Sequence, residues 1–190
     1  MIATPEGVRD EHVVVPMPPA GVARLSFDNG LSRLALRAGE LPHLLEATFA
    51  EPLPIVWAVD AKTHIEYPLG ARLLPRTRTS RVHLNPSLPW SVDVHGAAEG
   101  LDADLTGVDL CSLAFHAGLA RAAIALGRPR GTRTVRLASV DGLRLVRPRG
   151  VPVRVRTGES RLLDETPGYD AAADRYLVIV SGGASGLVLA

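Results

Sequence analysis

The sequence predicts an all-β chain, a β-solenoid-like stack of two-strand coils with one short helix near residues 41–50. The first observation is a recurring phrase, in which two apolar residues one apart are followed, after a break of about six residues, by a second such pair. The second is that the phrase returns roughly every 20 residues in the later part of the chain, as in repeat architectures. The third is a single stretch with helical spacing.

The phrase predicts a strand, a corner and a second strand, because side chains of a strand alternate with a period of two. Two looser copies continue the series at Val135-x-Leu137 with Leu143-x-Leu145 and at Val153-x-Val155 with Leu162. The four clear copies are Leu25-x-Phe27 with Leu34-x-Leu36, Val92-x-Val94 with Leu101-x-Ala103, Leu113-x-Phe115 with Ala122-x-Ile124, and Val178-x-Val180 with Leu187-x-Leu189.

The less regular part of the chain lies before residue 80. Residues 12–19 form a β run that ends in prolines, and residues 22–38 are the first full copy, with Asp28-Asn29-Gly30 at its corner. Two strands follow at residues 55–67 and one more at residues 81–84. The helix is predicted between the first copy and these strands, because the apolar residues Leu41, Leu44, Leu45 and Phe49 have the spacing i, i+3, i+4 and i+8.

The regular coils run from residue 91 to the end of the chain. Two near-identical turns, residues 128–131 and residues 147–150, both read Arg-Pro-Arg-Gly and separate successive coils. Residues 164–174 are predicted to be a longer, mobile excursion before the last coil.

Composition sets the class of protein. A chain of 190 residues that is 46% hydrophobic is long enough for one core, so we expect a single domain over residues 1–190. The formal net charge is +1, and Cys111 is the single cysteine, which excludes an intrachain disulfide or a cysteine-based zinc cage. No secretory signal or membrane-spanning segment is visible, so a cytoplasmic location is expected. No cofactor is predicted.

Three segments carry a resemblance to a known family. Residues 89–96, residues 147–155 and residues 178–185 resemble the toast-rack, or putative-adhesin, β-solenoid domains of bacteria, which include the C-terminal part of LiaF-like cell-envelope stress proteins and stand-alone actinobacterial members. The resemblance covers roughly residues 80 to 190 and implies a β-solenoid fold and an envelope- or stress-associated role. The corners at residues 116–118 and 138–140 depart from the family's usual Gly-Gly-Ala-Ser pattern.

Two groups of polar residues are candidates for metal binding. His95 and His116 follow the second apolar residue of consecutive coils, so stacking places them about 4.8 Å apart on one face, with Asp93 one strand step away. Such a pair suits a metal ion, and the simpler interpretation is an outward row of histidines. Asp102-x-Asp104-x-Thr106-Gly107 copies the start of a calcium loop, but Leu113 replaces the last ligand, which favours a solvated strand face.

The third signal is positive charge. Eleven arginines and only two acidic residues lie between residues 121 and 161. Arg136, Arg144 and Arg154 occupy the middle of the phrase and are predicted to form a solvent-facing strip that binds an anionic polymer or an acidic partner. Nucleic acid is not favoured, because aromatic residues for base stacking are missing there. Protection of the strands from edge-to-edge aggregation is the alternative interpretation.

The last coil predicts an interface. Val178, Val180, Leu187 and Leu189 end the stack without a charged or proline-bearing segment, so we expect this coil to pair with a second copy or another protein. The function predicted from these features is a non-enzymatic scaffold or interaction module. The alternative is a carbohydrate-active β-helix enzyme acting on an acidic polysaccharide, which needs acids and arginines that converge in one groove.

Overall fold

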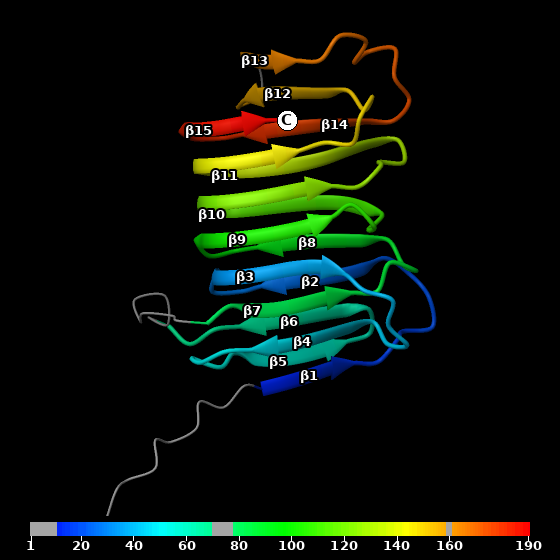
Figure 1. Cartoon of the computed structure of the whole chain (residues 1–190), viewed down its shortest axis with the longest axis vertical. Helices are drawn as coiled ribbons and strands as arrows, with labels where there is room; N and C mark the ends of the chain where they lie inside the picture. The colour runs from blue at the N-terminus through cyan, green and yellow to red at the C-terminus, as the bar shows by residue number, and fades with distance from the viewer. Residues whose placement is uncertain (1–10, 70–77, 159–160) are drawn as a thin grey trace, which may run out of the picture.

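The computed structural model describes residues 11–69, 78–158 and 161–190, and every regular element in these residues is a β-strand (Figure 1). The predicted all-β, solenoid-like fold is therefore confirmed. The fifteen strands are β1 (Glu11–Val15), β2 (Ala23–Phe27), β3 (Leu31–Ala38), β4 (Leu45–Phe49), β5 (Ile55–Val59), β6 (Lys62–Glu66), β7 (Ser80–Leu84), β8 (Trp90–Val94), β9 (Ala98–Leu105), β10 (Leu110–Leu126), β11 (Thr132–Val146), β12 (Val153–Thr157), β13 (Arg161–Glu165), β14 (Arg175–Val180) and β15 (Ala184–Leu189).

One hydrogen-bonded network joins all these strands, and β10 and β11 fold it into two layers. The first half of β10 pairs with β8 and its second half pairs with β9, and a register shift between Phe115 and Gly118 marks the corner. The first sheet has the order β5, β6, β2, β8, β10, β11, β14, β12, β13. The second sheet has the order β1, β4, β7, β3, β9, β10, β11, β15.

The core lies between the two sheets and consists of the apolar residues of the repeated phrase. In the first sheet, the first apolar residues of successive phrases are cross-strand neighbours, and each is at most 2% exposed: Leu25, Val92, Leu113, Val135 and Val178. The repeated phrase therefore places one apolar residue of each coil against the same position of the next coil. This stacking buries a continuous core that no single coil has alone.

The predicted helix near residues 41–50 is wrong. Residues 45–49 form β4, which pairs antiparallel with β1 on one edge and with β7 on the other. Leu45, Ala47 and Phe49 are buried, and the residues between them are half-buried, so the segment alternates with period two. The same apolar residues also fit one face of a helix. The segment is a strand because its backbone forms hydrogen bonds with strands on both sides.

The order of the coils in space differs from their order in the chain. The coil of β2 and β3 lies between the coil of β6 and β7 and the coil of β8 and β9. At the other end, β14 lies between β11 and β12, because the chain passes beyond its last coil and then returns.

The two ends of the stack are stepped (Figure 1). Among the described strands beyond the coil of β6 and β7, the first sheet continues with β5, whereas the second sheet continues with β4 and β1, one strand more. Beyond the coil of β14 and β15, the first sheet continues with β12 and β13, whereas no further strand of the described residues continues the second sheet. None of the segments described contains a helix long and apolar enough to span a membrane.

Candidate functional site

The end of the second sheet is an apolar edge. One edge of β15 pairs with β11, and among the described strands none pairs with its other edge. Its sequence, Ala-Ser-Gly-Leu-Val-Leu, holds no charged residue and no proline, which are the usual means of protecting a sheet edge. Val188 is 54% exposed, and the core-facing Leu187 is only partly buried, although its neighbour Leu143 in β11 is 1% exposed.

Two of the four predicted interface residues lie elsewhere. Val178 and Val180 belong to β14, and each is fully buried. The reason is that β12 pairs with the outer edge of β14, so that the last coil in the chain is not the last strand of the first sheet. Only Leu187 and Leu189 remain at the edge of the stack, both partly buried.

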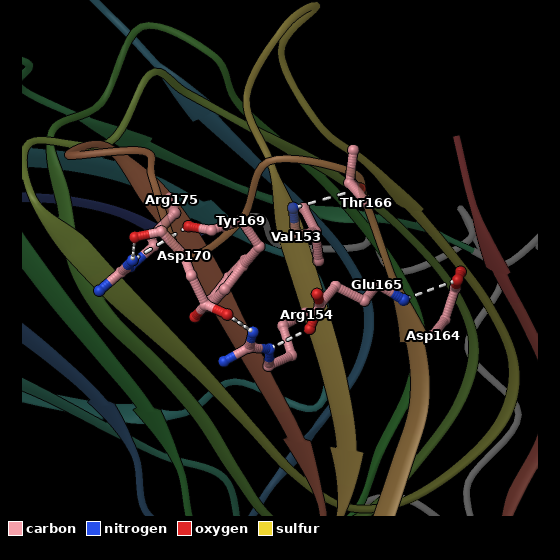
Figure 2. A network of polar contacts seen from close by, with 8 residues as sticks. All are labelled: Val153, Arg154, Asp164, Glu165, Thr166, Tyr169, Asp170 and Arg175. Atoms are coloured by element: carbon pink, nitrogen blue, oxygen red, sulfur yellow. Dashed lines mark hydrogen bonds and ion pairs between the residues drawn. The ribbon is translucent and has the colours of Figure 1, made fainter.

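A polar network lies on the outer face of the first sheet near its end, over β12 and β13 (Figure 2). The Arg154 guanidinium donates hydrogen bonds to the carboxylates of Glu165 in β13 and Asp170 in the following loop, and it lies 4.0 Å from the centre of the Tyr169 ring. Arg175 donates to the carbonyl oxygen of Tyr169 at 3.0 Å. The hydrogen bond from Arg154 lowers the pKa of Asp170. Residues 164–174, predicted to be mobile, are thus held against β12 and β14.

The predicted arginine strip does not form. Arg154 is used in this network, and its side chain is 14% exposed. In the register of the first sheet, Arg136 neighbours Ile179, and the next neighbour of Ile179 is Arg156. Arg144 lies on the second half of β11, beside Val188 in the second sheet. The inserted strand β14 and the corner in β11 therefore separate the three arginines, of which Arg136 and Arg144 are exposed.

The structure brings the three candidate metal ligands together on the outer face of the first sheet. The rings of His95 and His116 stack with centroids 4.7 Å apart and planes 8° apart. The Nε2 atom of His116 lies 3.3 Å from Oδ1 of Asp93. In the described part of the chain, no group of three or more His, Cys, Asp or Glu residues is arranged to hold a metal ion, so metal binding here stays a prediction.

A second aromatic and acidic group, which sequence analysis missed, extends this row. The rings of Trp57 in β5 and His64 in β6 stack 4.8 Å apart, and Nδ1 of His64 lies 2.8 Å from Oδ2 of Asp28. Partial burial raises the pKa of Asp28, but hydrogen bonds from Ser26 and His64 outweigh it and lower the pKa. Trp57 and His64 are partners in the hairpin of β5 and β6, whereas Asp28 is far from His64 in the chain and becomes its neighbour because β2 pairs with β6.

The calcium-like segment is the end of β9 and the turn that follows it. Asp104 accepts hydrogen bonds from the Thr106 amide at 3.1 Å and from its hydroxyl at 2.7 Å, which lower the pKa of Asp104. Asp102 forms an ion pair with Arg37 of β3. Each carboxylate therefore has its own partner, in agreement with the interpretation as a strand face.

A groove of about 990 Å³ follows one corner of the stack across five coils. Its lining is mostly small residues, with the carboxylates of Glu99 and Asp141 on its walls. Glu99 is paired with Arg121. Cross-strand register places Glu99 and Asp141 on either side of Ala120, two strand spacings or about 9.6 Å apart. Sequence analysis missed this groove, because its residues lie near the corners, where the repeated phrase is interrupted.

A row of residues with positive φ, in the left-handed backbone conformation, lies next to the groove. Gly100, Gly142 and Gly186 have φ of 66°, 72° and 61°, and Arg33 and Arg121 occupy the same conformation at 48° and 49°. These five positions are aligned in neighbouring coils. A residue with a side chain is strained in this conformation, whereas glycine is not. The two arginines therefore cost conformational free energy at these positions.

No family model and no curated protein matches this sequence. Among solved structures, the fold is similar to the crystal structure of a "putative cell adhesion protein" from Clostridium sporogenes ATCC 15579. The TM-score is 0.70 with 14% identity, and the match covers 96% of this chain and 98% of the other. At this identity the likeness establishes the fold alone, along almost the whole chain and including the part before residue 80.

Proposed function

We propose that this chain is a non-enzymatic interaction module that associates with a second copy of itself through the end of the stack at β15. The supporting observation is the unprotected apolar edge, with Val188 exposed and Leu187 partly buried below it. Burial of apolar surface stabilises an interface by about 25 cal/mol per Å². Backbone hydrogen bonds across the new edge add little net free energy, because water satisfies the same groups in the free chain.

The proposal also includes the family of the chain and the cellular process in which it takes part. The resemblance of residues 80–190 to toast-rack domains and the fold shared with a "putative cell adhesion protein" are both consistent with a binding role. We propose an envelope- or stress-associated process on this basis. The residue-level argument for association through β15 does not depend on the process.

Two matched valines test the proposal. Val188 of β15 and Val14 of β1 belong to the outermost strands of the second sheet at opposite ends, and they are 54% and 45% exposed. We expect wild type to have a dimer mass by light scattering, and Val188→Lys to dissociate at least tenfold more readily, because the ammonium group loses water at the interface. Val14→Lys should keep the dimer. A monomeric wild type at high concentration, or equal effects of both variants, contradicts the proposal.

A second candidate function comes from the corner groove. The predicted alternative, an enzyme that acts on acidic polysaccharide, requires acids and an arginine in one groove. Glu99 and Asp141 line this groove, and Arg121 is the ion-pair partner of Glu99. Inverting glycosidases hold two carboxyl groups roughly 6.5–9.5 Å apart. The pairing of Glu99 with Arg121 instead favours binding over acid catalysis. Release of reducing ends from an acidic polysaccharide by wild type, and its loss in Asp141→Asn, would support the enzyme.

A further inference from the structure

We infer that two copies interlock about a twofold axis parallel to the strands, so that β13 of each copy pairs with β15 of the other. This inference rests on the proposed self-association and adds its geometry. The observation behind it is the step at the β15 end of the stack. There β12 and β13 extend the first sheet by two strands beyond β14, whereas β15 is the last described strand of the second sheet.

A twofold axis along the strands makes the step self-complementary. The rotation turns the stack end over end and exchanges the two sheets, so the extended first sheet of one copy continues the short second sheet of its partner. Each copy then supplies the two strands that the partner's second sheet lacks. In the resulting dimer both layers run without a gap from one copy into the other, and β13 of the partner covers the core-facing Leu187 and Leu189.

Strand direction agrees with this arrangement. β12 and β14 are parallel, and β13 is antiparallel to both. In Figure 1 the arrows of β13 and β15 point in the same direction, opposite to those of β12 and β14. A rotation about an axis parallel to the strands leaves these directions unchanged. The new pair of β13 and β15 is therefore parallel, like the pairs that β11 makes with β10, β14 and β15.

Other ways of joining two copies leave strand positions empty. A twofold axis perpendicular to the sheets brings β13 against β13, and four positions stay empty between the two β15 strands. In head-to-tail stacking, the β15 end of one copy meets the β1 end of the next. The first sheet is two strands longer at the β15 end and the second sheet is one strand longer at the β1 end, so one strand position in the second sheet stays empty. An interlocked pair leaves none, and it is closed, because both copies use the same end.

The exposed apolar side chains lie where this pairing needs them. Leu162 and Leu163 of β13 are 52% and 44% exposed, and they are flanked by Arg161 and Asp164. Leu162 neighbours Arg156 on the outer face of the first sheet. Val188 points outward from the second sheet, since its neighbours in β15 face the core. In the dimer, Leu162 of one copy and Val188 of its partner share one outer face on adjacent strands.

Cysteine cross-linking tests the geometry. In a Cys111→Ser background, Leu162→Cys and Val188→Cys are made as separate proteins, then treated alone and as a mixture with a short bifunctional thiol reagent. Adjacent strands lie about 4.8 Å apart, so the mixture should yield a covalent dimer. Each protein alone should not, because the two Val188 positions lie three strand spacings, or about 14 Å, apart and in opposite sheets. The two Leu162 positions lie on opposite outer faces.

Each outcome separates the two ideas. Cross-linking in the mixture alone supports the interlocked pair. Cross-linking of Val188→Cys with itself, with a dimer mass by light scattering, overturns this geometry and keeps the self-association. A dimer mass without any cross-link also overturns the geometry. A monomer mass for the Cys111→Ser parent and for wild type overturns both. Val14→Cys mixed with Leu162→Cys is the matched control and should give no covalent dimer.

Discussion

The two ends of this stack are finished in different ways. At the N-terminal end, β1 and β4 run antiparallel, and the outermost strand β1 carries Glu11 and His12, the latter 2.9 Å from Glu46 of β4. At the C-terminal end, β15 is the last described strand of the second sheet, and it is a parallel strand without a charged residue. Leu45, one strand inside the N-terminal end, is fully buried, whereas Leu187 is partly exposed. The contrast is the basis of the proposal that a second copy covers the C-terminal end of the stack.

The largest expected effect compares these two leucines. Leu45→Ala should destabilise the fold by about 2–5 kcal/mol, the usual cost of emptying a fully packed leucine site. Leu187→Ala should cost roughly 1 kcal/mol in dilute solution, because its site is already open. Urea unfolding at low protein concentration measures both. Equal costs would mean that the C-terminal end is as closed in the single chain as the N-terminal end.

A middle-sized effect concerns the protection of backbone amides. If a second copy covers β15, exchange of its amide hydrogens should slow by about tenfold or more between dilute and concentrated protein, equivalent to at least 1.4 kcal/mol. The amides of β1 should exchange at one rate in both samples. Mass spectrometry of peptides from the two strands measures this, and a concentration effect shared by β1 would point to association at both ends.

The smallest effect concerns acid. The pKa of Glu46 is lowered by hydrogen bonds from His12 and His43, and that of Asp170 by the hydrogen bond from Arg154. A carboxylate with a lowered pKa in the folded state contributes stability above its ordinary pKa, and this contribution is lost as the pH falls below it. Both groups are exposed, so the effect is small.

We therefore expect each end to loosen separately as the pH falls below 4.5, the ordinary pKa of a glutamate, and then below 3.8 for the aspartate. Glu46→Gln should remove the acid response of β1 alone, and Asp170→Asn that of the loop after β13 alone. Amide exchange as a function of pH measures both. A response of both ends to either variant would show that the ends are coupled.

The sequence predicted the coils because their side chains obey one local rule. Each apolar pair, such as Val92 and Val94, alternates with the strand period, and stacking of equal coils then puts His95 beside His116. The rule failed around Leu45, because the apolar residues there fit both the helical and the strand period. Pairing with the neighbouring strands β1 and β7 makes the segment a strand. Local patterns predict which residues share a strand face, and long-range pairing decides the rest.

The errors at the other predicted sites have one cause. The arginine strip assumed that coils follow one another in space as they do in the chain, but β14 separates Arg136 of β11 from the strand that carries Arg154. The same insertion buries Val178 and leaves Leu187 at the edge. No residue pattern in the chain marks this return. The groove beside Asp141 and the contact of His64 with Asp28 were missed for the related reason that they depend on which coils become neighbours.

The interleaved order of the coils also limits how this protein grows in evolution or by design. Gene duplication adds a repeat without disturbance only where neighbours in the chain are neighbours in the stack, and here that block runs from β8 through β11. A copy inserted after β3 or before β14 would have to enter a slot between strands made by other parts of the chain. Lengthening the molecule therefore means multiplying its middle while both ends stay as they are.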